Sequence, residues 1–123
     1  MRRQVYVTNT ELLAEIRIYW DTGKYSNKLV LMIQKMVTKI ANSRNFYGYE
    51  FKHDMMQEGI IHALYKGIPG FKKDKKNPFS FLSTVIVNKY LEIIKKEKKN
   101  IIIKNVLKEQ EIERVKQKTQ NRI

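Results

Sequence analysis

The stretch that decides the fold is NPFSFLSTVIVNKYLEIIKKEKK, residues 77–99. Asn77 followed by Pro78 has the form of a helix N-cap with proline at the first helical position, so a helix is expected to begin here. At 100° per residue, one side of this helix carries a stripe typical of a buried core: Phe79, Ser83, Ile86, Val87, Tyr90, Ile93 and Ile94. We predict one long helix from residue 77 to at least residue 99.

The other side of the same helix changes character along its length. It starts with Phe81 and Val85, continues through Asn88 and Glu92, and ends with Lys95 and Lys99. One interpretation is a nucleic-acid surface, in which the apolar residues meet bases, Asn88 and Glu92 read base edges, and lysines hold phosphates. The alternative, that the first helix or the C-terminal tail covers Phe81 and Val85, stays open.

Outward from this helix, the apolar spacing predicts three more helices and no strands. Thr8-Asn9-Thr10-Glu11 has the form of a capping box and opens the first helix, whose apolar stripe is Leu12, Leu13, Ile16, Tyr19 and Trp20. The second helix covers about residues 26–42, and the third about residues 54–66, with Gly67 and Pro69-Gly70 ending it. We expect an all-α protein: a single compact helical domain of about four to five helices over residues 1–100, then a charged tail over 101–123, partly helical or disordered.

Composition narrows the class of protein. The chain has 123 residues, 25 Lys plus Arg against 12 Asp plus Glu, and no Cys, so its formal net charge is +13. One domain of ordinary size fits this length. The absence of cysteine excludes disulfides and a thiolate zinc site. Apolar runs are too short for a membrane span or a signal peptide. We expect a soluble, intracellular, basic domain.

The positive charge is concentrated in residues 66–108, which hold twelve bases and three acids. Two lysine clusters dominate this stretch: Lys72, Lys73, Lys75 and Lys76 around Asp74, and Lys95, Lys96, Lys98 and Lys99 around Glu97. Clusters that bracket an amphipathic helix favour a polyanion partner, above all nucleic acid. Plain solvated lysines, an acidic protein and an anionic membrane are the alternatives.

The third helix carries the most acidic surface of this basic chain. Asp54 and Glu58 lie four residues apart with Gln57 between them, although Asp54 is equally explained by its favourable position near a helix N-terminus. His62 follows Glu58 by four residues and is interpreted as its surface partner. His53 and His62 are too far apart to share a metal ion without other ligands, so we assign no metal site. Without a phosphate loop, a nucleophile or paired acids, we expect no enzymatic activity and no cofactor.

Several motifs resemble region 2 of bacterial sigma factors, and in particular the late-transcription sigma factors of T-even-type phages. The run Asp54-Met-Met-Gln57-Glu58-Gly59, then Phe71, Phe79-Ser80 and Thr84 follow the region 2 pattern. The phage resemblance adds Asn9-Thr10-Glu11-Leu12-Leu13, Asn45-Phe46, Gly48-Tyr49, Lys76-Asn77-Pro78 and Ile94-Lys95-Lys96-Glu97. Together these motifs cover about residues 9–99 in the same order as in the family.

The resemblance implies two binding surfaces. The third helix, with Asp54, Gln57, Glu58, Ile61 and His62, looks like the surface that grips the β′ coiled coil of bacterial core RNA polymerase. The fourth helix and its preceding loop look like the element that engages −10-type promoter DNA, through Lys72, Lys73, Lys75, Lys76, Asn77, Phe79, Phe81, Val85, Asn88, Lys89, Glu92, Lys95, Lys96 and Lys99. Phe79 is the awkward member, because the helical wheel places it on the core side. The implied location is the cytoplasm of an infected bacterial host.

The sequence also departs from the family. Val85 and Ile86 stand where general sigma factors carry an aromatic doublet that helps to open the duplex. We expect recognition of a short −10-like element only, because the chain leaves no room for a domain that reads a −35 element. Phage late sigma factors end in a hydrophobic-acidic segment that binds the sliding clamp, whereas this chain ends in a basic, polar run from Lys118 to Ile123. A need for a clamp or a coactivator therefore stays open.

Three functional hypotheses follow. The first is a sigma subunit for phage late promoters. The second is a free-standing helical DNA- or RNA-binding protein, which explains the charge but gives Asp54, Gln57 and Glu58 no task. The third is an inhibitor that occupies the sigma site on the polymerase and blocks host transcription, for which Phe81 and Asn88 would be dispensable.

Overall fold

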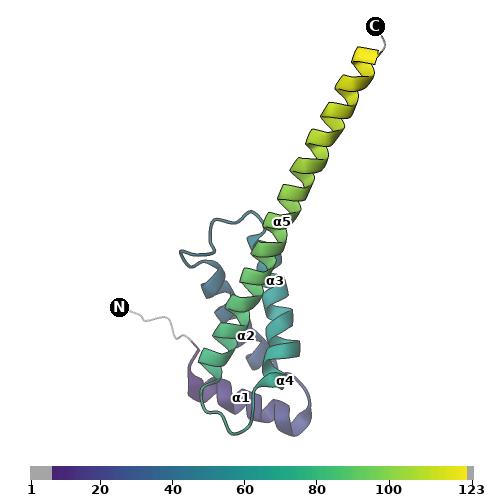
Figure 1. The fold of residues 1–123 in the computed structure, drawn as a ribbon. Helices are drawn as coiled ribbons and strands as arrows, with labels where there is room; N and C mark the ends of the chain where they lie inside the picture. The colour runs from purple at the N-terminus through teal and green to yellow at the C-terminus, as the bar shows by residue number, and fades with distance from the viewer. Residues whose placement is uncertain (1–6, 122–123) are drawn as a thin grey trace. The chain divides into compact units, whose positions relative to one another are not determined.

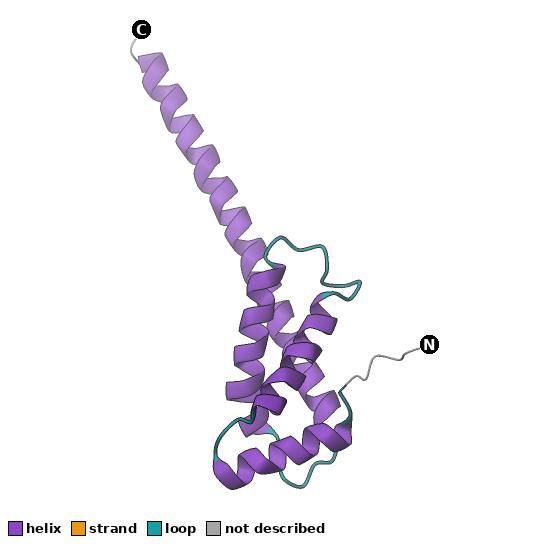
Figure 2. Ribbon diagram, turned by 180° about the vertical axis from the view of Figure 1, so that it is seen from behind, coloured by secondary structure: helices purple, strands orange, loops and turns teal. Residues whose placement is uncertain are grey.

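The computed structural model describes residues 7–121, and over that range every regular element is helical (Figure 2). The elements are α1 (Asn9–Thr22), α2 (Asn27–Ala41), α3 (Lys52–His62), a π-helical turn η1 (Ala63–Gly67), α4 (Ile68–Gly70) and α5 (Pro78–Asn121). The all-α prediction is confirmed. The chain divides into two compact units, residues 1–90 and residues 91–123.

Local capping residues define the first two helices. The Thr8 hydroxyl accepts a hydrogen bond from the Glu11 backbone N–H at 3.3 Å, and Gly23 closes α1 with a φ of 72°, a left-handed conformation that suits glycine. The Ser26 hydroxyl caps α2 by accepting from the Leu29 N–H at 3.1 Å. Both helices therefore begin within a residue of the predicted positions.

The third predicted helix needs a correction. The helical run does not end at Gly67 but continues through η1 into the short helix α4. It ends at Gly70, as the Pro69-Gly70 pair predicts, and Phe71 is extended. Gly67 has a packing role instead: a Cβ added there would lie 2.9 Å from Leu82 Cδ2. Its role is to let this segment approach α5 closely. Pro69 has no N–H to donate to the preceding turn, and the helical run ends one residue after it, at Gly70.

The core of the first unit lies between α1, α2, α3 and the start of α5 (Figure 1). Its fully buried side chains include Leu12, Ile16, Leu29, Ile33, Met36, Met55, Leu82, Ile86 and Tyr90. Of the predicted stripes, the buried members are Leu12 and Ile16 in α1 and Ile86, Tyr90 and Ile94 in α5. The other members are only half-buried: Leu13, Tyr19, Trp20, Phe79, Ser83, Val87 and Ile93. Leu82 belongs to the core although the predicted stripe does not include it.

Tyr90 joins three parts of this core. Its hydroxyl donates a hydrogen bond to the Val37 carbonyl at 2.9 Å, and its ring meets Phe46 edge-on at a centroid distance of 5.3 Å. A Cβ built on Gly59 would lie only 2.8 Å from Tyr90 Cε1, so no larger residue fits there without movement. The glycine of the Gln57-Glu58-Gly59 run is thus a packing residue between α3 and α5.

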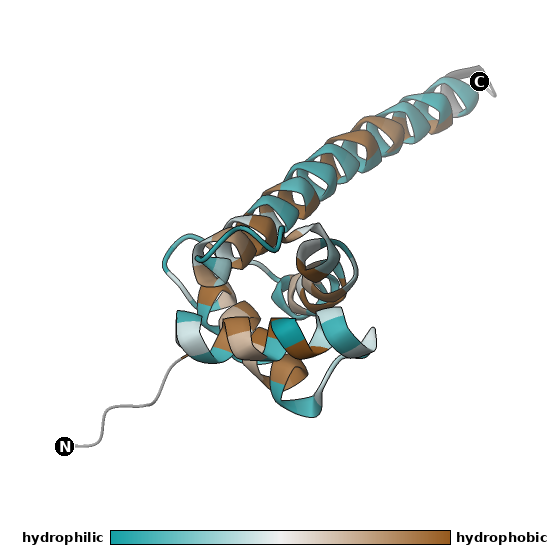
Figure 3. Cartoon of the chain, turned by 90° about the horizontal axis from the view of Figure 1, so that it is seen from below, coloured by the Kyte–Doolittle hydropathy of each residue, from teal (hydrophilic) through white to brown (hydrophobic). Residues whose placement is uncertain are grey.

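The second unit, residues 91–123, is described to Asn121 and consists of the rest of α5. The tail, for which the sequence allows either a helix or disorder, is helical. Hydrophobic and hydrophilic residues alternate along it (Figure 3), and several apolar side chains are exposed: Ile101, Ile102, Ile103, Val106, Leu107, Ile112 and Val115. Within the described residues, no helix combines the length and the hydrophobicity that a membrane crossing requires.

Candidate nucleic-acid and protein interfaces

Two asparagines fix the start of α5. Asn77 Oδ1 accepts a hydrogen bond from the Ser80 N–H at 3.1 Å, which is the expected N-cap. Asn9, from the start of α1, supplies a second acceptor: its Oδ1 receives the Phe79 N–H at 2.9 Å. Because two backbone donors of the first turn are satisfied by side chains, the direction in which Phe81 leaves the helix is well defined.

Phe81 borders a pocket between the start of α5 and the loop that precedes it. The pocket has a volume of about 280 Å³ and is lined by Gly70, Phe71, Lys72, Lys75, Lys76, Asn77 and Phe81. The rings of Phe71 and Phe81 are 5.4 Å apart, centroid to centroid, with 56° between their planes. Phe71 is buried, whereas Phe81 is 36% exposed. The pocket is therefore lined by an aromatic wall and by three lysine side chains.

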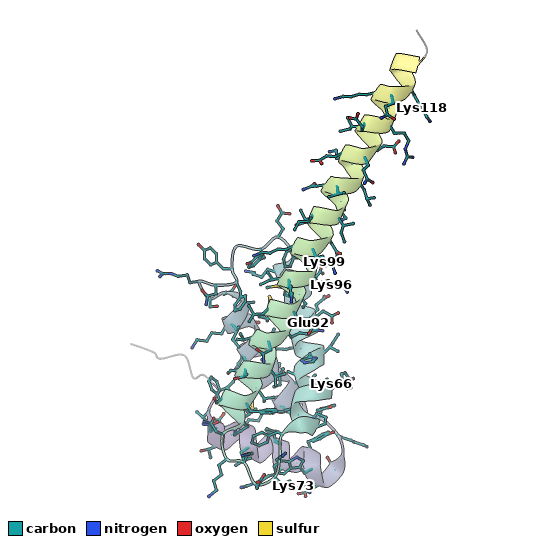
Figure 4. The ribbon with its side chains drawn as sticks, viewed as in Figure 1. Lys66, Lys73, Glu92, Lys96, Lys99 and Lys118 are labelled. Atoms are coloured by element: carbon teal, nitrogen blue, oxygen red, sulfur yellow. The ribbon has the colours of Figure 1, made fainter. Side chains whose placement is uncertain are left out.

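Trp20 of α1 extends this aromatic surface. Its ring is nearly parallel to that of Phe71, at 5° and 6.2 Å between centroids, and Lys73 Nζ lies 5.8 Å from the Trp20 centroid. The approach of Lys73 is a cation–π interaction, which fixes the position of a lysine from the loop against α1 (Figure 4). The helical pattern of α1 predicts Trp20 only as part of a core stripe, and no local pattern links it to residues of this distant loop.

Five of the predicted DNA-binding residues thus line one pocket: Lys72, Lys75, Lys76, Asn77 and Phe81. The four lysines of the loop are exposed, and Asp74 is the acid among them. Phosphate groups would meet a concentrated positive potential here, and flat bases would meet rings. The ring of Phe71 packs against that of Phe81.

The remaining predicted residues of the first unit are placed less favourably. Asn88 is exposed, whereas Phe79, Val85 and Lys89 are half-buried. Val85 faces Gly67, because a Cβ added to that glycine would lie 3.4 Å from Val85 Cγ1. Ile86, its neighbour, is fully buried. Val85 and Ile86 therefore both take part in packing.

Glu92, Lys95, Lys96 and Lys99 belong to the second unit. All four are exposed along α5, and Figure 4 labels Glu92, Lys96 and Lys99 on this helix. Glu92, Lys95 and Lys99 lie on the helix face that the wheel predicts, and Lys96 lies beside it.

The predicted protein-binding residues share the surface of α3. Asp54, Gln57 and Glu58 are exposed, Ile61 is 50% exposed, and His62 is half-buried. Gln57 Nε2 lies 3.3 Å from His53 Nε2, so these two side chains form a hydrogen bond across one turn. The side chains at positions 54, 58 and 61 recur every three to four residues, which places them on one face of the helix. This face is acidic at its start and apolar at its end.

Within residues 7–121, no group of three or more His, Asp or Glu side chains is arranged to hold a metal ion.

No protein-family model matches this chain, and no curated protein matches it either. Its own residues and geometry therefore carry the functional argument.

Proposed function

We propose that the chain is a promoter-specificity (sigma) subunit, which binds bacterial core RNA polymerase and directs it to −10-like late promoters of a phage. The observation that carries this proposal is the pocket at the start of α5, where Phe71 and Phe81 form an aromatic wall and Lys72, Lys75 and Lys76 surround it. Rings that stack on unpaired bases beside ammonium groups that hold phosphates are the usual means of binding single-stranded nucleic acid.

The acidic face of α3 supports the polymerase half of the proposal. Asp54 also stabilises the first turn of α3, but Glu58 gives no advantage to a chain that binds only nucleic acid, because its carboxylate repels phosphates. A protein partner with basic side chains would be attracted to both carboxylates. The close approach of Gly59 to Tyr90 packs α3 against α5. The helix that carries the proposed polymerase face therefore shares a core with the helix that carries Phe81.

The burial of Ile86 and the packing of Val85 bear on how the duplex would open. Neither residue replaces the aromatic doublet of general sigma factors, so the pocket of Phe71 and Phe81 is the place where an unpaired base would be held. We therefore expect initiation to depend on supercoiling or on a template that is already open. A linear duplex template should give much weaker transcription.

The test is in vitro transcription with this protein, bacterial core polymerase and supercoiled phage late-region DNA, with mapped transcript starts. Discrete starts that share an AT-rich element about one helical turn upstream support the proposal. Phe81→Ala should abolish those starts and leave polymerase binding intact, because stacking on an aromatic ring is worth about 1–3 kcal/mol per base. Glu58→Lys should weaken polymerase binding.

The same experiment separates the alternatives. Binding to the polymerase without any transcript, and no effect of Phe81→Ala on the inhibition of host transcription, would favour an inhibitor. Sequence-selective DNA binding without polymerase, unaffected by Glu58→Lys, would favour a free-standing nucleic-acid-binding protein.

A further inference from the structure

Three tyrosines form a second aromatic cluster, and one of them, Tyr65, comes directly after α3 in the chain. Tyr19 lies near the end of α1, Tyr25 lies between α1 and α2, and Tyr65 lies in η1. The rings of Tyr19 and Tyr25 are stacked at 4.9 Å and 13°, and Tyr65 meets Tyr25 edge-on at 5.9 Å and 84°. We call these three residues the tyrosine cluster. No local sequence pattern predicts it, because it joins segments that are far apart in the chain.

The main chain is shaped to hold this cluster. The Tyr25 hydroxyl donates a hydrogen bond to the Leu64 carbonyl, inside the π-helical turn. A π-helical turn departs from the α-helical hydrogen-bond pattern, and such turns occur frequently at functional sites. Burial, and to a smaller extent the neighbouring Tyr19 and Tyr65, raise the pKa of Tyr25 to about 12, so its hydroxyl remains a donor at neutral pH.

Core packing does not explain why Tyr65 is held in this way. Its side chain is 65% exposed, so its burial contributes little to the hydrophobic core. Its ring contacts that of Tyr25, and any restriction that this contact places on the ring lowers the conformational entropy lost when a partner binds. Tyrosine is also among the residues that most often dominate the binding energy of protein interfaces.

The position of Tyr65 indicates its partner. Along α3 and η1, Glu58 is followed by Ile61 after three residues and by Tyr65 after seven, so the exposed face runs from carboxylates through an apolar side chain to an aromatic ring. Carboxylates and the faces of aromatic rings both attract cations. Arginine suits such a surface best, because its planar guanidinium pairs with carboxylates and stacks on rings.

We infer that the polymerase-binding face extends beyond His62 to the tyrosine cluster, where the ring of Tyr65 receives an arginine side chain from the basic partner helix. The inference rests on the proposed function, since it names a further anchor on the same face. It assigns Tyr65 the role of that anchor, and it assigns Tyr19 and Tyr25 the role of positioning it.

The test measures the affinity of the full-length protein for bacterial core RNA polymerase, with thermal unfolding of each variant as a control of folding. Tyr65→Ser should weaken binding about tenfold or more, as expected for an interface anchor. Tyr65→Phe should bind like the wild type, because the ring keeps its face. Tyr65→Leu should be weakened, because it keeps apolar area and loses the ring. Tyr47→Ser is the matched control, since Tyr47 is 63% exposed in the loop between α2 and α3.

The outcomes are distinguishable. Wild-type affinity for Tyr65→Ser, together with weakened binding of Glu58→Lys, would overturn the inference and leave the proposed function in place. Equal affinities of Tyr65→Leu and Tyr65→Phe would overturn the arginine interaction. Wild-type binding by both Glu58→Lys and Tyr65→Ser would reject the polymerase face itself. If Tyr65→Ser is poorly folded, Tyr65→Lys decides, because a folded Tyr65→Lys that binds normally contradicts an incoming arginine.

Discussion

Asn9 and Phe79 are seventy residues apart in the chain, yet Asn9 Oδ1 accepts the Phe79 backbone N–H at 2.9 Å. The first residue of α1 thereby caps the first turn of α5. The helix that carries Phe81 is consequently held at its start by a side chain from the opposite end of the first unit's sequence, in addition to its own cap Asn77.

Asn9→Ala should lower the free energy of unfolding by about 1 kcal/mol, the usual effect of removing a helix cap. Urea denaturation monitored by circular dichroism measures the change. Asn45→Ala, in the exposed loop after α2, is the matched control and should leave the midpoint unchanged. If Asn9→Ala is as stable as wild type, Asn77 alone suffices as the cap.

Gly59→Ala should destabilise the protein, although alanine is the better helix former. The added Cβ would lie 2.8 Å from Tyr90 Cε1, and the Tyr90 ring cannot move freely because its hydroxyl is bonded to Val37. Overpacking of this kind costs about 1–3 kcal/mol, more than the roughly 1 kcal/mol that helix propensity returns. Thermal unfolding tests it against Gly48→Ala, where nothing lies within 4 Å of the added atom. A stabilised Gly59→Ala would show that α3 and α5 separate easily.

Stability should fall as the pH rises above 10. Burial raises the pKa of Tyr25 from 10.0 to about 12 in the folded protein, so the unfolded chain loses this proton first. Between these two pH values the unfolded state binds fewer protons, and linkage then requires the free energy of unfolding to decrease with pH. The contribution of Tyr25 is complete below pH 10 and is lost as the pH approaches 12.

Comparison with Tyr25→Phe isolates this contribution, because every other residue is the same in both proteins. Denaturation at a series of pH values between about 9 and 12 should give a shallower decline for the variant. Identical slopes would show that the Tyr25 hydroxyl titrates as it does in the unfolded chain.

The lysines of the pocket should control the salt dependence of DNA binding. Replacing Lys72, Lys75 and Lys76 together by alanine should flatten the plot of log affinity against log salt by about 0.7–0.9 for each phosphate that is no longer bound. Binding of the polymerase complex to promoter DNA, measured by fluorescence anisotropy at several salt concentrations, gives this slope. The variant with Lys24, Lys28 and Lys35 replaced by alanine has the same net charge and is the control. Equal slopes for both variants would mean that net charge alone, and not the pocket, attracts DNA.

Local signals predict the helices of this chain well. Three helices begin at a residue whose side chain accepts a hydrogen bond from the first turn: Thr8, Ser26 and Asn77. Such an N-cap can be predicted because the backbone donor lies only three residues away. The prediction that Gly67 ends a helix is wrong for the opposite reason. The role of Gly67 depends on Leu82, fifteen residues later, and spacing within one helix does not reveal which helix will pack against it.

The candidate interface is predictable in part. The lysine run and Phe81 are visible in the sequence, because charge density and helical angle are local properties. The contribution of Trp20 is not, since its parallel arrangement with Phe71 follows from where α1 lies against the loop. The tyrosine cluster escapes prediction for the same reason, and no residue pattern indicates a π-helical turn.

Trp20 is the sole tryptophan of the chain, and its ring lies near both Phe71 and the ammonium group of Lys73. Indole emission responds to the charge and polarity around the ring, and here that surrounding is the lysine loop at the edge of the pocket. The unlabelled protein therefore carries its own fluorescent reporter, at the edge of the pocket that we propose binds nucleic acid.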